Sequence, residues 1–348
     1  MQIKLQDKEE ITIIDKNGLE VHSYSRLKLW GFCNQAHFFR YVEKIEPMVT
    51  ARPLKFGSHL HALLAADKGA EPVEAVLERV DKEYQAMFIE EREFYGNLPE
   101  DLRTVFGGYK KFWEVEDLYY VYQMVEAELG PVPLTKYTSL TIRPDRVAQD
   151  IRNDKKFLFE TKTGKSIPSE DYRLWDMQTF LYIWGMRELG HNIDGIIWDH
   201  VRSKVPTIPQ ALKKGGLSQA KNIDTTYDVY YKAILDNGLN PDDYEEFLKS
   251  LVGKENKFYR RVKLPVKENM LLPVVEGARR TSLEIYHLGK CTPVKNISRN
   301  TCGMCSFRPI CEAELLDLDV DYVKETQFRP RPPREGEEVG SEEETTED

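Results

Sequence analysis

The sequence predicts a mixed α/β (α+β) protein in which a central sheet is flanked by helices. Two observations lead to this class. Apolar residues recur at helical spacing up to about residue 130, whereas residues 137–148 and 156–163 are rich in β-forming residues. Beyond these strands, expected helices and strands alternate. A hydrophobic fraction of 41% and a charged fraction of 31% suit a globular protein with its own core.

The first half of the chain is expected to be mostly helical. A helix over residues 23–45 would begin at Ser23 or Ser25 as N-cap and place Cys33 on its apolar stripe. A second helix is expected to start near residues 56–57. Further helices are expected over 71–95 and 99–130.

The second half is expected to supply most of the sheet. Residues 137–148 and 156–163 should pair as a hairpin, with a turn at Asn153-Asp154. The remaining expected elements are a helix at 169–190, a strand at 195–201, a loop at 204–222, helices at 225–237 and 241–251, a strand at 257–264 and a helix at 266–288.

The charge balance is acidic, and part of the excess lies in the last twenty residues. The net charge is −9, of which residues 329–348 contribute −5, from three Arg against seven Glu and one Asp. We expect this Pro-, Gly- and Glu-rich stretch to be disordered. A body charge of about −4 argues against a nonspecific polycation but permits a local basic groove for nucleic acid.

Hydropathy and cysteine usage indicate the compartment. No apolar run approaches the ~20 residues that span a bilayer, and the first residues form no apolar signal core. The five cysteines are an odd number, which favours metal binding or free thiols over disulfides. A cytoplasmic protein without membrane association is therefore expected.

Three charged residues on the expected hairpin form a candidate catalytic group. Alternation along a strand places Leu158, Glu160 and Lys162 on one face, and Asp145 on the neighbouring strand would converge with them. Two carboxylates form an oxygen site for Mg²⁺ or Mn²⁺, and a nearby lysine can steady an attacking water. Alone, this pattern is more often a solvated surface pair.

Two helices carry possible companions of this group. His59 and His61 are separated by about 200° around one helix, so at most one of them faces the site. Gln178 and Tyr182 are i and i+4 neighbours on the expected helix at 169–190. Ordinary packing roles explain each of these residues equally well when it is taken by itself.

A cysteine cluster lies near the end of the expected fold. Cys302, Cys305 and Cys311 have the spacing C-x2-C-x5-C, which leaves one ligand position to be filled by Cys33 or Cys291. Spacing alone permits either a structural zinc ion or an iron–sulfur cluster.

Taken together and in this order, the motifs resemble the RecB-type nucleases of the PD-(D/E)XK superfamily. The resemblance rests on Gly57-xxx-His61, Asp145, Glu160-x-Lys162 and Gln178-xxx-Tyr182. It implies a restriction-endonuclease-like core in which the divalent metal is held by His61, Asp145, Glu160 and the Thr161 carbonyl. Lys162 would be the catalytic lysine, and Gln178 and Tyr182 would support the site and the DNA. The usual Gly before the motif Asp is replaced here by Arg143-Pro144.

The same resemblance suggests how the cysteines are used. AddB-like and CRISPR-associated members have one Cys before the His motif and three after the core, which together hold a 4Fe–4S cluster. Cys33, Cys302, Cys305 and Cys311 match this layout, with Cys291 left as a free thiol. The cluster would clamp the two ends of the domain together. Residues 199–218 also look like the version carried by bacteriophages, which would place the protein in the host cytoplasm.

The resemblance also implies a domain layout. Its parts are an N-terminal extension at 1–22, a nuclease domain at 23–311 with a helical insertion at about 65–135 and a cluster-binding end at 291–311, a C-terminal segment at 312–328 and the acidic tail at 329–348.

Two functions from different classes fit these expectations. The first is a metal-dependent DNA exonuclease acting on single strands or ends in phage replication, recombination or DNA processing, with a possible homo-oligomer or recombination partner. The alternative is a catalytically idle, cluster-stapled DNA-binding subunit. Basic residues that would line a DNA groove, or only aid solubility, lie in the loop 204–222 and at Lys254, Lys257, Arg260, Arg261 and Lys263.

Overall fold

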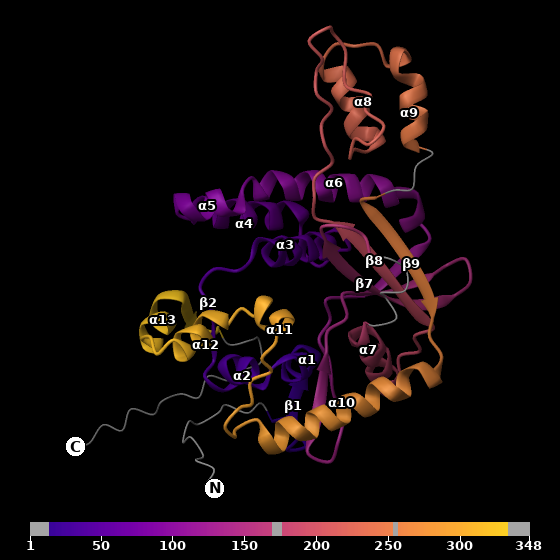
Figure 1. The fold of residues 1–348 in the computed structure, drawn as a ribbon. Coiled ribbons are helices and arrows are strands. Elements are labelled where there is room, and N and C mark those ends of the chain that lie inside the picture. The colour runs from indigo at the N-terminus through magenta and orange to yellow at the C-terminus, as the bar shows by residue number, and fades with distance from the viewer. Residues whose placement is uncertain (1–13, 169–175, 253–256, 333–348) are drawn as a thin grey trace, which may run out of the picture.

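The computed structural model describes residues 14–168, 176–252 and 257–332 and is built around a five-stranded mixed sheet (Figure 1). The strand order is β3-β6-β7-β8-β9. The pair β7–β8 is parallel, and the other neighbours are antiparallel. The strand bounds are Tyr120–Val125 for β3, Arg146–Asp150 for β6, Lys155–Gly164 for β7, Gly195–Arg202 for β8 and Tyr259–Pro265 for β9. The predicted α/β class with a mixed central sheet is confirmed.

The expected helix over 23–45 is interrupted at Cys33. Helix α1 spans Tyr24–Phe32 and begins at Ser23, whose side chain accepts a hydrogen bond from the Arg26 amide. Cys33 then has an extended backbone, with φ −167° and ψ 121°. The Asn34 side chain donates to the Trp30 carbonyl, which the Asn34 backbone amide would bind in a continuous helix. After Cys33 come α2 (Asn34–His37), a π-helical turn (Phe38–Val42) and strand β2 (Ile45–Pro47).

Helices α3 (Arg52–Asp67) and α6 (Leu98–Asp117) lie over one side of the sheet, and α4 (Val73–Ala86) and α5 (Ile89–Tyr95) lie beside them (Figure 1). The expected helix over 99–130 is wrong beyond Asp117, because the chain continues as strand β3 and then β4 (Leu129–Pro133). The rings of Tyr120 and Tyr122 contact Phe159 of β7, so tertiary packing favours a strand over a helix for residues 120–125.

The opposite side of the sheet is covered by α7 and α10. Helix α7 spans Met177–Glu188, and residues 169–175 of the helix expected there lie outside the described residues. Helix α10 spans Glu268–Leu288. Both helices pack with Leu158 and Ile196 of the sheet in the largest hydrophobic cluster. Within the described ranges, no helix combines the length and apolar character that a membrane span requires.

A smaller module projects from the edge of the sheet between β8 and β9 (Figure 1). It contains α8 (Tyr227–Asp236), a 3₁₀ turn (Pro241–Tyr244) and α9 (Glu245–Val252). Its own core includes Tyr230, Ile234 and Phe247. The loop, helices and following strand expected for this region are present, although residues 253–256 are outside the described part of the chain.

The strand expected over 137–148 is divided in two. Strand β5 (Thr138–Ile142) belongs to a separate three-stranded sheet of order β1-β5-β4, in which β1 is Glu20–Ser23. Strand β6 then starts at Arg146 in the main sheet. Pro144 lies in the break and has no amide to donate to a ladder, which accounts for the change of sheet. Asp145 consequently occupies the break between two sheets.

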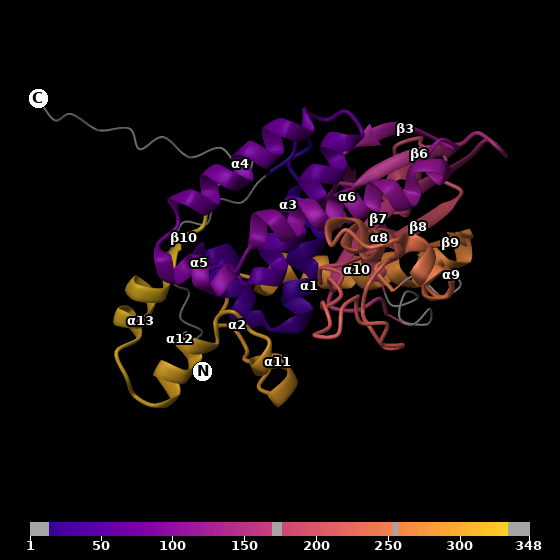
Figure 2. The same ribbon diagram turned by 90° about the horizontal axis from the view of Figure 1, so that it is seen from above.

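The C-terminal segment returns to the first helices. Figures 1 and 2 both show α11 (Arg299–Gly303), α12 (Arg308–Leu315) and α13 (Val320–Gln327) beside α1 and α2. Strand β10 (Phe328–Pro330) pairs antiparallel with β2. The tail expected to be disordered from Arg329 therefore begins in a strand, and its residues 333–348 are not among the described ones.

Candidate active site

Strand β7 carries Glu160 and Lys162, and its side chains alternate between two faces as expected. Leu158 belongs to the cluster formed with α7 and α10, whereas Phe157 and Phe159 belong to a cluster on the other face. This alternation follows from strand geometry. Lys162 contacts the N-terminal end of α7, which places it on the Leu158 face.

Glu160 is a buried carboxyl with one unused oxygen. Its residue exposure is 2%, its Oε1 accepts a 2.7 Å hydrogen bond from Lys162 Nζ, and its Oε2 has no partner. Burial and the nearby Asp145 raise the pKa of Glu160 to about 8 despite the lysine. For Lys162, burial opposes the charge, but Glu160 and Asp176 raise its pKa above the usual value. A further positive charge beside Glu160 would offset the free-energy cost of burying its carboxylate and would reduce the repulsion between Glu160 and Asp145.

Asp145 is held against the backbone of β7 and against α3. Its Oδ2 accepts a 2.7 Å hydrogen bond from the Thr161 amide and lies 3.4 Å from His61 Nδ1. Burial favours the neutral carboxyl, but His61 and the Thr161 amide hold the pKa of Asp145 below its usual value. In turn, burial lowers and Asp145 raises the pKa of His61, and the net shift is upward.

Only one histidine of the pair on α3 faces this group. His61 approaches Asp145, whereas His59 Nε2 lies 3.5 Å from Glu83 Oε2 on α4. The helical-wheel expectation that at most one of the two reaches the site is confirmed.

Glu126 is a carboxylate that sequence reasoning missed. One ligand atom from each of His61, Glu126 and Asp145 lies within 4.8 Å of the others. The Glu126 amide donates to the Asp145 carbonyl at 2.9 Å, and the backbone has a positive φ of 48°. Its position inside an expected helix concealed it. Gly130 and Pro131 signalled an earlier helix end, but no spacing linked Glu126 to Asp145.

The start of α7 completes the surroundings of Lys162. The Lys162 Nζ atom lies 3.3 Å from Gln178 Oε1 and 3.1 Å from Asp176 Oδ2. Asp176 was also missed, because it fell inside the helix expected at 169–190. It is instead the N-cap residue of α7, and its side chain makes no cap hydrogen bond. Tyr182 lies one turn further on and is buried, and burial with the Glu160 charge raises its pKa to about 12. The structure thus brings Gln178 and Tyr182 to the predicted group.

A buried ion network lies on the opposite face of β7. The Arg146 guanidinium donates to Thr161 Oγ1 at 2.6 Å and to Asp199 Oδ2 at 2.9 Å. Arg261 Nε lies 3.4 Å from the other Asp199 oxygen. Thr161 is therefore bonded through its hydroxyl to this network and through its amide to Asp145. Arg261, expected at a DNA groove, is instead a buried member of the network.

The cysteines of the motif converge from both ends of the chain. Cys33, Cys305 and Cys311 pack against one hydrophobic cluster. Burial raises the pKa of the Cys305 thiol, and Cys33 and Cys302 add to the shift. Burial likewise raises the pKa of Cys311 to about 11. Within the described ranges, no three thiol sulfurs lie within 4.8 Å of one another, so the structure shows no ready site there for a single metal ion.

Comparison with known proteins settles the family. The family model described as "PD-(D/E)XK nuclease superfamily" matches residues 21–312. The chain belongs to the PD-(D/E)XK nuclease superfamily. This membership indicates a metal-dependent nuclease with DNA as substrate and agrees with the group formed by His61, Glu126 and Asp145.

Single relatives add little to this membership. A solved structure titled "Crystal structure of SSO0001" is similar at 15% identity over 68% of this chain and 81% of that chain, with a TM-score of 0.27. No curated protein matches the sequence.

Proposed function

We propose that this superfamily member is a deoxyribonuclease that degrades single-stranded DNA or DNA ends from a terminus. The observation that carries the proposal is the buried, unpartnered Oε2 of Glu160, next to Asp145 and to the Lys162 ammonium. An orphaned carboxylate oxygen in the interior is costly unless a cation or donor satisfies it. Perturbed carboxyl pKa values of this kind are typical of catalytic groups.

The residues around this oxygen fit a hard divalent cation. His61, Glu126 and Asp145, whose ligand atoms lie within 4.8 Å of one another, would hold Mg²⁺ or Mn²⁺. Glu160, which lies outside that group, and the Thr161 carbonyl would be the further ligands. When bound by these residues, such an ion would attract a phosphate oxygen and would lower the pKa of a coordinated water.

The roles of the other residues follow from their contacts. Lys162 remains charged because Glu160 and Asp176 raise its pKa, and its ammonium would orient the attacking water and stabilise developing negative charge. Gln178 accepts a hydrogen bond from Lys162 and so fixes the direction of that ammonium. Tyr182 keeps its proton at neutral pH and is available as a donor toward the site.

We further propose that Cys33, Cys302, Cys305 and Cys311 hold a 4Fe–4S cluster. The support is the convergence of these thiols from two distant segments. Each thiolate of such a cluster binds a different iron, so its ligands lie further apart than those of one ion. No three of these thiol sulfurs lie within 4.8 Å of one another in the described chain, which suits a cluster of several irons better than one zinc ion.

Degradation of end-labelled single-stranded DNA tests the proposed activity. We expect loss of substrate with Mn²⁺ and none with EDTA, and the fate of 5′ and 3′ labels gives the polarity. Covalently closed single-stranded circles should survive, because an exonuclease needs a terminus. Cleavage of the circles would contradict the exonuclease assignment, and no cleavage of any DNA would favour the idle binding subunit.

A further inference from the structure

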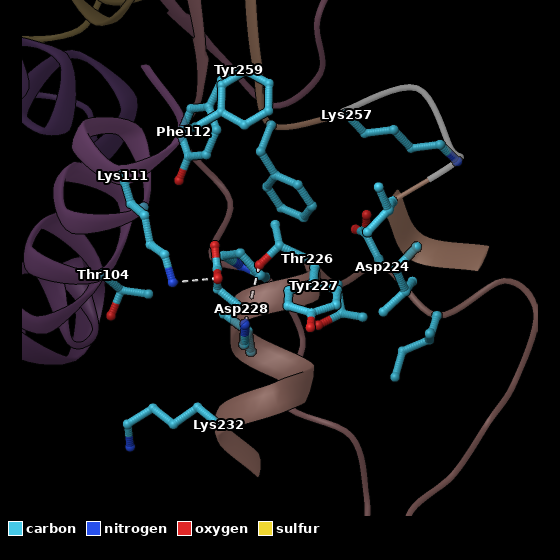
Figure 3. A pocket seen from close by; sticks show the side chains of 18 of the residues that line it. Thr104, Lys111, Phe112, Asp224, Thr226, Tyr227, Asp228, Lys232, Lys257 and Tyr259 are labelled. Atoms are coloured by element: carbon cyan, nitrogen blue, oxygen red, sulfur yellow. Dashed lines mark hydrogen bonds and ion pairs between the residues drawn. The ribbon is translucent and has the colours of Figure 1, made fainter. Parts of the chain in front are cut away.

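A cavity lies outside the catalytic group, between α6 and the α8–α9 module (Figure 3). Its volume is about 550 Å³, which falls in the range of small-molecule sites. One wall is α6, and the other is formed by the segment that precedes α8 and by the first turns of α8. Lys111 of α6 and Asp228 of α8 form a 2.5 Å ion pair that joins the two walls.

Aromatic rings from three elements face this cavity. Phe112 of α6 and Tyr227 of α8 are large exposed aromatic side chains, with exposures of 44% and 39%. Phe258 and Tyr259 line it from the start of β9 and are themselves buried. Figure 3 labels Phe112, Tyr227 and Tyr259 around one space. Exposed rings on a cavity wall provide a surface on which a flat heterocycle can stack.

The charge around the cavity is positive. The lining contains Lys111, Lys221, Lys232 and Lys257 against two aspartates, Asp224 and Asp228. Both aspartates are paired, Asp228 with Lys111 and Asp224 with the further cations Arg202 and Lys204, and Lys232 is paired with Asp236 outside the lining. The N-terminus of α8, capped by Thr226, also opens here and adds a partial positive charge. The walls therefore favour an anionic ligand.

Small residues let the cavity reach the backbone of α6. Gly107 lines it, and a Cβ added there would meet no atom within 4 Å. The Thr225 hydroxyl oxygen, also in the lining, is buried and has no hydrogen-bond partner. The open space beside Gly107 leaves room for a flat aromatic ring.

The cavity is tied to the end of the catalytic strand pair. Arg202, the last residue of β8, makes a bidentate ion pair with Asp224 in the cavity wall. In the parallel register, Lys162 is opposite His200, so Arg202 lies about 7 Å further along the strands. A single strand that leaves the catalytic group in this direction would pass the cavity.

We propose that this cavity binds one nucleotide of a single-stranded DNA substrate, with the base stacked between Phe112 and Tyr227 and the phosphate near the lysines. The inference rests on the proposed function and names the form of its substrate. Because a free nucleotide has the same base and phosphate chemistry, the test must distinguish a free nucleotide from one that is part of a DNA strand.

The experiment measures binding without cleavage. Fluorescence anisotropy of a labelled oligodeoxythymidine in EDTA gives the affinity of the full chain and its variants. Phe112→Ala and Tyr227→Ala should each weaken binding about 5- to 100-fold, in line with the loss of one stacked base. Gly107→Leu introduces a better helix former on α6 and places a side chain in the cavity, and it should weaken binding to a similar extent. Phe94→Ala, an exposed aromatic on α5 outside the cavity, is the matched control and should bind normally.

Two results would overturn the inference. One is unchanged affinity in all three cavity variants, and the other is equal affinity for dTMP and the oligonucleotide, which would assign the cavity to a free nucleotide. Failure of the proposed function is distinguishable from these results. If the wild-type chain cleaves no DNA with Mn²⁺ while the cavity variants still bind the oligonucleotide more weakly than the wild type does, the binding site is supported and the nuclease activity is not.

Discussion

Arg146 and Asp199 form a 2.9 Å ion pair between β6 and β8 in the interior, where their side chains are 2% and 0% exposed. The pair crosses beneath β7, and the same guanidinium holds the Thr161 hydroxyl. Because Thr161 also donates its amide to Asp145, the buried pair supports the strand that carries the catalytic group.

Removal of one partner should therefore leave a buried charge. We predict that Arg146→Met lowers the free energy of unfolding by about 3 kcal/mol, the lower end of the usual range because Arg261 also approaches Asp199. Urea denaturation measures the change. The double variant Arg146→Met/Asp199→Asn should recover part of the loss, and an equal or larger loss in the double variant would show that the two charges do not compensate one another.

Glu160→Gln and Lys162→Ala should separate metal binding from catalysis. Glu160→Gln removes the charge beside the proposed ion and should weaken both Mn²⁺ binding and cleavage. Lys162→Ala leaves the ligands in place and should lower single-turnover cleavage by a factor corresponding to about 2–4 kcal/mol of barrier, with Mn²⁺ affinity nearly unchanged. Calorimetric Mn²⁺ titration and cleavage assays check both statements. Near-normal cleavage by both variants would refute the assignment to this hairpin.

Glu126 offers a prediction that no sequence motif supplies. Glu126→Gln should weaken Mn²⁺ binding by at least about tenfold, because a charged oxygen near His61 and Asp145 is lost. Glu128→Gln is the matched control, since Glu128 is exposed and contacts only the Thr141 hydroxyl at 3.3 Å among the described residues. Equal Mn²⁺ affinity in the two variants would remove Glu126 from the ligand set.

The cysteines allow a prediction with a visible readout. Cys33→Ala, or Ala at any of Cys302, Cys305 and Cys311, should abolish the brown colour of a 4Fe–4S protein and destabilise the fold. Cys291→Ala is the internal control and should leave colour and stability unchanged. Visible absorbance and iron content provide the measurement. Bleaching by Cys291→Ala but not by Cys33→Ala would show that the ligand set is wrong.

Acid should destabilise the protein through two buried histidines. Burial lowers the pKa of His22 below its usual value of 6.5 and lowers that of His37 to about 3. As the pH falls below 6.5, these histidines become protonated in the unfolded chain but remain neutral in the folded protein. The free energy of unfolding therefore decreases as the pH is lowered. His37→Gln should reduce this slope in urea titrations between pH 6.5 and 4. An unchanged slope would show that His37 is protonated in the folded state.

Several parts of this arrangement were predictable from local pattern. The β6–β7 hairpin, the alternation on β7 and the single inward histidine of α3 follow from turn signals and from strand and helix periodicity, which act on neighbouring residues. Motif order brought Asp145, Glu160, Lys162, Gln178 and Tyr182 into one hypothesis, and the structure places these side chains around one another.

The failures have tertiary causes. Residues 120–125 carry apolar side chains that a helix could also display, and only the Phe159 surface of β7 selects a strand. The helix break at Cys33 depends on one side-chain hydrogen bond from Asn34. Glu126 and Asp176 reach the site through folding contacts with partners that no fixed spacing in the sequence indicates.

The pairing of β10 with β2 also has a consequence for the order of events during synthesis. Residues 328–330 form their ladder with residues 45–47, and Lys324 binds Glu43. Strand β10, the partner of β2, is therefore among the last parts of the described chain to leave the ribosome. Contacts of such long sequence separation form late and slowly. A nascent chain arrested before residue 320 would leave Phe38 and Phe39 without part of their cover, and it would present an exposed apolar surface to chaperones and proteases.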